Sequence, residues 1–227
     1  KGWANTLNHR RGRRDALHQA LDLARIDQET LEAMLGAMNA SFPTFQRYYA
    51  AKAKRLGTEK LAWWDIFAPA GRTEKTYTFD EASDFIVTHF GGFSQELADF
   101  ARRAFAHNWI DAEQREGKRG GAFCMGLPLV RESRVLCNFD GTLDQVSTVA
   151  HELGHGFHNH CAYQAGRTPL QKETPMTMAE TASIMCETII MQAILNETKD
   201  PQAELAILET QLIGDAQVIV DIYSRYL

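Results

Sequence analysis

Two histidines and a glutamate in the run His151-Glu152-Leu153-Gly154-His155 have the types and spacing of a metal-activated hydrolytic site. Residues four apart on a helix project from nearly the same face, so His151 and His155 can reach one ion. Glu152 lies about 100° further round the helix, beside the ion but not bound to it. Imidazoles suit zinc, and a site with three protein ligands keeps a fourth position for water. The predicted chemistry is attack by zinc-bound water, with Glu152 as the base that passes the water's proton to a leaving amine.

The third ligand of this one predicted zinc ion must come from another part of the chain. Glu173, Glu180 and Glu187 are the downstream candidates. Glu180 begins an apolar stretch, Met178–Asn196, that is expected to form a buried helix, and a carboxylate there needs a partner. The alternative is that Thr177 and Glu180 form a capping box, in which case Glu180 would only cap its own helix.

Three further residues could support the metal or the substrate. Glu187 follows Glu180 by seven residues, on nearly the same helix face, and could accept an N–H from a ligand histidine. It could equally be a partly buried glutamate that pairs with an arginine. Asp144 stands seven residues before His151, but an acidic residue in a first helical turn is already favoured by the helix dipole. His158 shares the ligand face and has either a substrate-contacting or a purely structural role.

The motif needs a helix that places it, and one is predicted over Leu143–Cys161. Thr142 and Gln145 have the spacing of a capping box at its start. Gly154 and Gly156 each cost roughly 1 kcal/mol relative to alanine inside a helix. Such residues are tolerated where another element packs closely or where the helix lines a cleft, so we expect a close neighbour or a cleft at these positions.

Four other helices are expected from apolar residues at helical spacing and from capping residues at their starts. They are a helix over Gln28–Leu56, one that starts near Asp80, one that follows a break at Gly91-Gly92 and is capped by Ser94, and one after Asp200-Pro201. Pro43 is expected to kink or divide the first of them.

A small β element is expected just before the motif helix. The β-prone runs Ala122–Met125 and Arg134–Phe139 are predicted to pair as antiparallel strands. Glycines that precede the first run permit close backbone approach, so Gly121, Ala122 and Phe123 could pair with a peptide substrate. A plain turn into a strand is the alternative. The fold class is therefore mainly α, with a helical part over 1–116, the β element over 117–140 and metal-binding helices over 141–227.

Composition excludes several other functions. The 227 residues are 44% hydrophobic, which suffices for a core of one or two domains. A net charge of −5 does not favour a nucleic-acid partner, and the arginine-rich run over 10–14 is expected to be a solvated face. No uncharged apolar run reaches the ~18 residues of a membrane span, so no membrane partner is predicted. The four cysteines form no C-x-x-C pair and are expected to be reduced and buried, as in a cytoplasmic protein.

The residues around the motif resemble a known enzyme family. The runs 147–158 and 179–183 are similar to the thimet oligopeptidase family of zinc metallopeptidases, and most similar to its bacterial oligoendopeptidase F branch. The glutamate ligand of that family lies 25 residues after the second histidine, which falls on Glu180 in the matching Glu-Thr-Ala-Ser context. A third histidine of the family is matched by His158. The runs 120–123 and 138–142 also match.

The resemblance implies a zincin-like helical fold and a zinc endopeptidase. Its helices would enclose a channel that admits short, unfolded oligopeptides. It also implies that 1–227 are the catalytic region of a larger enzyme, in which a later His and Tyr segment stabilises the oxyanion. A zinc carboxypeptidase of related fold and a non-catalytic peptide-binding module remain the rival interpretations, and the sequence carries no signal for oligomeric state.

Overall fold

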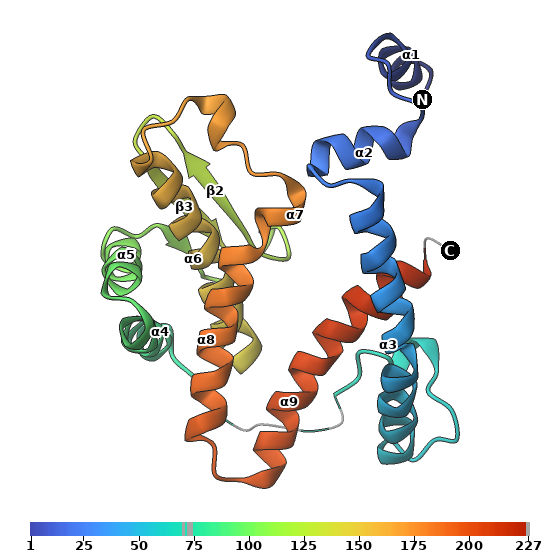
Figure 1. Ribbon diagram of the computed structural model, residues 1–227. Helices are drawn as coiled ribbons and strands as arrows, with labels where there is room; N and C mark the ends of the chain where they lie inside the picture. The colour runs from blue at the N-terminus through green and yellow to red at the C-terminus, as the bar shows by residue number, and fades with distance from the viewer. Residues whose placement is uncertain (70, 72–74, 226–227) are drawn as a thin grey trace. The chain divides into compact units, whose positions relative to one another are not determined.

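A computed structural model describes residues 1–69, 71 and 75–225 and is mainly helical (Figure 1). The chain forms two compact units. One unit contains the described residues up to 71, 175–177 and 205–225. The other contains 75–174 and 178–204, and it includes the whole of the predicted metal motif. The predicted fold class is confirmed.

The first unit is built mostly from helices. These are α1 (Gly2–Arg10), α2 (Ala16–Ala24), α3 (Gln28–Arg55), the short 3-10 helix η1 (Trp63–Asp65), most of α9 (Pro201–Ala216) and the π-helical turn η3 (Gln217–Ile222). Asp27 caps α3 by accepting a hydrogen bond from the Thr30 amide at 2.7 Å. The expected division at Pro43 does not occur, because α3 continues through it. A proline removes only one hydrogen bond, and the turns on either side retain theirs.

The second unit contains both helices and the small sheet. In chain order it has α4 (Phe79–Phe93), α5 (Gln95–Ala106), β1 (Ile110–Asp111), β2 (Phe123–Leu127), β3 (Glu132–Leu136), α6 (Leu143–Gln164), the 3-10 helix η2 (Pro169–Lys172), part of α7 (Met176–Ala179), and α8 (Thr181–Glu197). The predicted break at Gly91-Gly92 is wrong, because both glycines lie inside α4 and the helix ends just before Ser94. Ser94 caps α5 as expected.

The sheet has the strand order β1-β3-β2. The antiparallel pairing of β2 with β3 is confirmed, with Cys124 opposite Val135. The parallel pairing of β1 with β3 was not expected, so the sheet is mixed. A strand of two residues is too short to show the alternation by which strands are recognised in a sequence.

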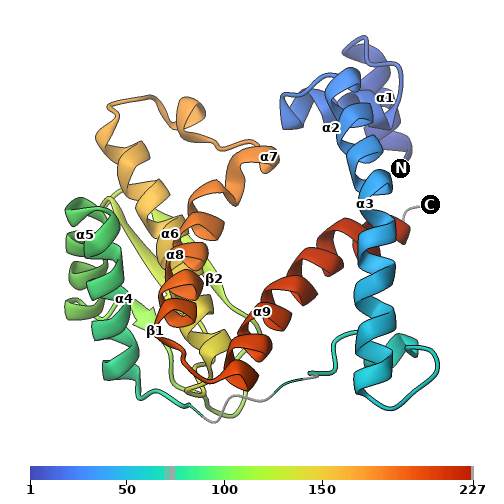
Figure 2. The same cartoon turned by 60° about the horizontal axis from the view of Figure 1, so that its bottom comes forward.

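The core of this unit forms where α6 packs against α8, and these helices lie side by side in both views (Figures 1 and 2). The apolar residues at this contact are almost fully buried: Val146, Val149, Leu153, Cys186 and Ile190. A Cβ added to Gly154 would lie 2.6 Å from the Ala182 carbonyl oxygen, and one on Gly156 would lie 2.9 Å from Phe100. The close neighbours predicted from these two glycines are therefore present.

The burial of the cysteines differs in part from the expectation. The four cysteines are free, but Cys161 is exposed and only Cys137 and Cys186 are buried, so the expected burial is wrong for Cys161.

The stretch Met176–Glu197 is long and apolar enough to cross a membrane by length and composition alone. Its α8 portion packs on α6 and contains Glu187, so we interpret it as a core helix.

The contact at Gly154 can be tested by adding one methyl group. Gly154→Ala should destabilise the protein by about 1–3 kcal/mol, because the new Cβ would overlap the α8 backbone and neither helix can yield cheaply. Gly92→Ala is the matched control, since no atom lies within 4 Å of its added Cβ. The control should be neutral or stabilising by up to about 1 kcal/mol. Urea unfolding would measure both, and equal stability of the two variants would contradict the close contact.

Candidate metal centre

Three side chains from α6 and from the start of α8 converge on one point. The ligand atoms of His151, His155 and Glu180 all lie within 4.8 Å of one another. Each histidine Nε2 is 3.2 Å from the same oxygen, Oε2 of Glu180. The two rings are nearly perpendicular, at 81°, with centroids 4.9 Å apart. The structure therefore brings together the three residues that were predicted as ligands.

Glu180 reaches this point because the predicted helix Met178–Asn196 is interrupted at Glu180. The residue lies between α7 and α8 with φ −94° and ψ 5°, a sparsely populated conformation that is common at active sites. The capping box with Thr177 is not formed, since the Thr177 hydroxyl donates to the Ala24 carbonyl instead. Ser183 donates its hydroxyl hydrogen to Glu180 Oε2 at 2.7 Å and so orients the carboxylate. This role of Ser183 was not predicted, although a serine three residues after the glutamate is a visible signal.

Glu187 lies against the first histidine of the motif. Its Oε2 is 3.1 Å from His151 Nδ1, which leaves Nε2 to face Glu180. The hydrogen bond to Glu187 raises the pKa of His151, and burial opposes this shift. The geometry is the one required for orienting a ligand histidine. Asp144, the other candidate for this role, accepts a hydrogen bond from Gln145 Nε2 at 3.4 Å, and among the described residues His151 makes its hydrogen bond and ion pairs with Glu187 and Glu180 instead.

The second histidine has the opposite electrostatic environment. Burial lowers the pKa of His155, and the nearby Glu180 carboxylate opposes this shift. A hydrogen bond to the Ala179 backbone also favours its charged form. His155 is thus biased toward the neutral imidazole, the form that can bind a metal.

Glu152 is buried beside this group, with only 6% of its surface exposed. Its Oε2 has no hydrogen-bond partner among the described residues. Burial raises the pKa of Glu152, while His151 opposes this shift and Glu180 adds to it. In the described part of the chain, the ion pairs of Glu180 and Glu187 involve only histidines. A carboxylate-rich group with an unsatisfied buried oxygen and two imidazoles fits a divalent cation such as zinc.

His158 is near this group but not part of it. Its Nε2 lies 3.4 Å from the Thr174 hydroxyl, which connects α6 to the segment before α7. The ligand group contains His151, His155 and Glu180 but not His158.

The predicted peptide-binding segment is only partly a strand. Gly121 and Ala122 precede β2, which begins at Phe123. Gly121 has φ +81°, a conformation that other residues rarely adopt. Among the described strands, β2 pairs only with β3, so its other edge is free. β2 packs against α6, which carries Glu152. Burial raises the pKa of Cys124 in β2, and the Glu152 carboxylate adds to this shift.

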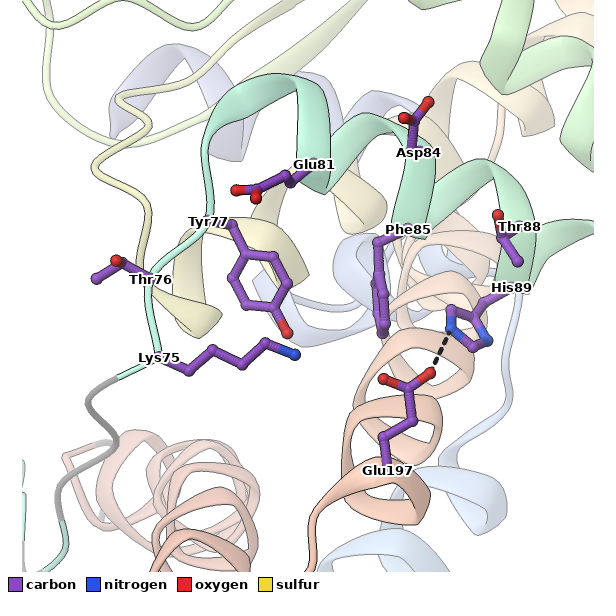
Figure 3. A pocket seen from close by; sticks show the side chains of 9 residues that line it. All are labelled: Lys75, Thr76, Tyr77, Glu81, Asp84, Phe85, Thr88, His89 and Glu197. Carbon is purple, nitrogen blue, oxygen red and sulfur yellow. Dashed lines mark ion pairs between the residues drawn. The ribbon is translucent and has the colours of Figure 1, made fainter.

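A pocket of about 450 Å³ elsewhere in the same unit was not foreseen and shares no residue with the ligand group (Figure 3). The Lys75 ammonium lies 4.7 Å from the centre of the Tyr77 ring, and His89 pairs with Glu197 at 3.3 Å. Lys75, His89 and Glu197 thus have partners within the pocket. It lies between α4 and the end of α8, and neither His151 nor His155 lines it.

Comparisons with known proteins agree on one family. The model described as "Peptidase family M3" matches residues 4–214. The group B oligopeptidase PepB of Streptococcus agalactiae is 30% identical over 88% of this chain and 33% of its own length. Oligopeptidase PepF of Bacillus subtilis is 25% identical over 88% of this chain and 30% of its own length. The chain thus spans about a third of the length of these curated relatives.

Solved structures share the fold. A structure assigned as a peptidase of Chlamydophila abortus is similar with a TM-score of 0.77 and 27% identity, covering 90% of this chain and 34% of the other. Oligoendopeptidase F of Enterococcus faecium has a TM-score of 0.59 at 18% identity, with coverage of 93% and 30% respectively. The second likeness concerns the fold alone.

The contact between His151 and Glu187 predicts a pH effect in the metal-free protein. Glu187→Gln should lower the pKa of His151, as followed by NMR of its imidazole. Because folding raises this pKa, the contact stabilises the fold fully below the unfolded-state pKa, and its contribution is lost as the pH rises through the folded-state pKa. The stability gap between parent and variant should therefore shrink as the pH rises above the ordinary histidine pKa of about 6.5. Glu173→Gln, at an exposed position, is the control. An unchanged His151 pKa in Glu187→Gln would exclude the contact.

Proposed function

This chain belongs to peptidase family M3, and from that premise we propose that it hydrolyses internal peptide bonds of short, unfolded oligopeptides with zinc as its metal cofactor. The observation that carries the proposal is the convergence of His151, His155 and Glu180 beside the buried Glu152. A metal-binding triad next to an unpartnered carboxylate is the arrangement that metal-assisted hydrolysis requires.

Three atoms would hold the zinc ion: Nε2 of His151, Nε2 of His155 and Oε2 of Glu180. When bound, zinc acts as a Lewis acid that acidifies water and polarises the scissile carbonyl. Glu187 keeps the Nδ1 hydrogen of His151 engaged, so that its Nε2 lone pair faces the metal position. Ser183 orients the Glu180 carboxylate by donating its hydroxyl hydrogen to Oε2.

Glu152 is the proposed general base. Its burial raises its pKa toward the pH at which a carboxylate can both accept and return a proton. It would take a proton from the attacking water and deliver it to the leaving amine. The absence of a competing hydrogen bond to its Oε2 in the described structure leaves that oxygen available for this transfer.

The proposed substrate binds as an extended strand. The free edge of β2, together with Gly121 and Ala122, offers main-chain groups that can pair with any peptide backbone. Such pairing requires an unfolded segment, which supports a preference for oligopeptides over folded proteins. The four free cysteines support a cytoplasmic location.

The role of Glu180 can be tested by metal analysis. Glu180→Ala should lose zinc under mild chelation that leaves the parent with one zinc per chain, because two histidines alone lack the third protein ligand. Glu173→Ala is the matched control and should retain its metal. Zinc content would be measured by mass spectrometry after chelation. Full zinc retention in Glu180→Ala would move the third ligand to another residue.

The role of Glu152 can be tested by kinetics in the full-length protein. Glu152→Gln should retain zinc but lose about 10²–10⁴ in kcat, because the amide cannot accept the water's proton. The substrate should be a short peptide with both ends blocked, which a carboxypeptidase cannot cleave. Near-normal kcat in Glu152→Gln would remove this residue from the mechanism.

A parent that cleaves only peptides with a free C-terminus would be a carboxypeptidase, and one that binds peptides without cleaving them would be a binding module.

A further inference from the structure

A buried lysine lies just before the proposed peptide-binding segment. Only 2% of the Lys118 side chain is exposed. Its Nζ contacts the main-chain carbonyl oxygens of Asp111, Glu113 and Cys137 at 2.9, 2.8 and 2.6 Å. It also contacts Oδ1 of Asp111 at 3.1 Å. The three hydrogens of an ammonium group are therefore all used, and the lysine ties together the end of β1 and the residue after β3.

The burial of the Lys118 ammonium group has a free-energy cost. Burying an ammonium group carries a desolvation penalty of several kcal/mol, which the fold must offset with well-placed oxygens. A residue such as methionine would fill the same volume without that penalty. The oxygens that Lys118 gathers are mostly main-chain atoms, so the lysine fixes the path of the backbone more than it balances charge.

A second side chain holds the same segment from the other end. Asn138 donates its two amide hydrogens to the carbonyl oxygens of Arg119 and Gly121, both at 3.0 Å. The backbone from Lys118 to Gly121 is thus fastened to the two residues that follow β3, Cys137 and Asn138. Gly121, with φ +81°, then redirects the chain into β2.

The segment that these two side chains hold is the entry to the free sheet edge. β2 starts at Phe123, two residues after the last anchored carbonyl. β2 packs against α6, the helix that carries Glu152 and both ligand histidines. Any shift of the segment from 119 to 122 would therefore weaken the pairing of a peptide backbone with this edge.

We propose that Lys118 is a positioning residue for substrate binding, which acts by fixing the backbone of Arg119–Phe123 at the β2 edge. The inference rests on the proposed peptidase function and on peptide pairing at this edge. Because the pairing is made equally in the ground state and the transition state, its loss raises KM and leaves kcat almost unchanged.

The test uses the zinc-loaded, full-length protein and a short peptide with blocked ends. Lys118→Met should raise KM about tenfold, the effect of misplacing one or two backbone hydrogen bonds, with kcat within about twofold and zinc content unchanged. Arg115→Met is the matched control, because Arg115 pairs with the same Asp111 carboxylate at 2.7 Å but from an exposed position. The control should keep the KM of the parent.

A second variant keeps the inference testable if Lys118→Met does not fold. Asn138→Ala removes the other anchor and should raise KM by a similar factor, again at constant kcat. A parent-like KM in the folded Lys118→Met, or a fall in kcat alone, would overturn the proposal. If the parent cleaves no peptide, the proposed function fails instead. Amide hydrogen exchange at 119–123, expected to be faster in Lys118→Met, then decides separately whether the lysine holds this segment.

Discussion

The candidate centre depends on how closely two helices approach each other. The motif helix α6 supplies both histidines and the base, while the third carboxylate stands at the start of α8. They meet only because Gly154 has no side chain, so that the backbone at Ala182 and Ser183 can lie directly against it. This contact is one turn from His151 and adjacent to His155. The glycine within the motif therefore determines the position of Glu180, although it contributes no functional atom of its own.

Much of the fold and of the candidate site could be predicted, because both depend in part on residue spacing and capping interactions within short stretches of sequence. The spacing of His151 and His155 fixes their common face on any helix, and the glycine signal correctly indicated a close neighbour. Capping residues located the starts of most helices, since a side-chain oxygen that meets a free amide is a local interaction. At Thr142 the expectation was only half right. Its hydroxyl accepts from the Gln145 amide, but its own amide donates to Asp140 rather than to the Gln145 side chain.

What the patterns could not provide depends on contacts between distant parts of the chain. The interruption of the helix at Glu180 leaves no mark in hydrophobic periodicity, because the two histidines that contact its carboxylate come from a distant part of the chain. The short β1 exists only through its pairing with β3. The continuity of α3 across Pro43 likewise cannot be predicted by a rule that assigns a helix propensity to each residue separately. The choice of Glu180 over its neighbours required the family resemblance.

The buried lysine also determines where the chain can change length. Lys118 contacts the carbonyl oxygens of Asp111, Glu113 and Cys137, so an insertion among 112–117 would have to bulge outward without moving these atoms. The β2–β3 hairpin is different, because Leu129 at its tip is fully exposed and Val130 largely so. Loops of that kind accept insertions and grafted sequences. Two connections in one small sheet thus differ sharply in evolutionary freedom, and an engineer who wished to tag or split this unit would choose the hairpin.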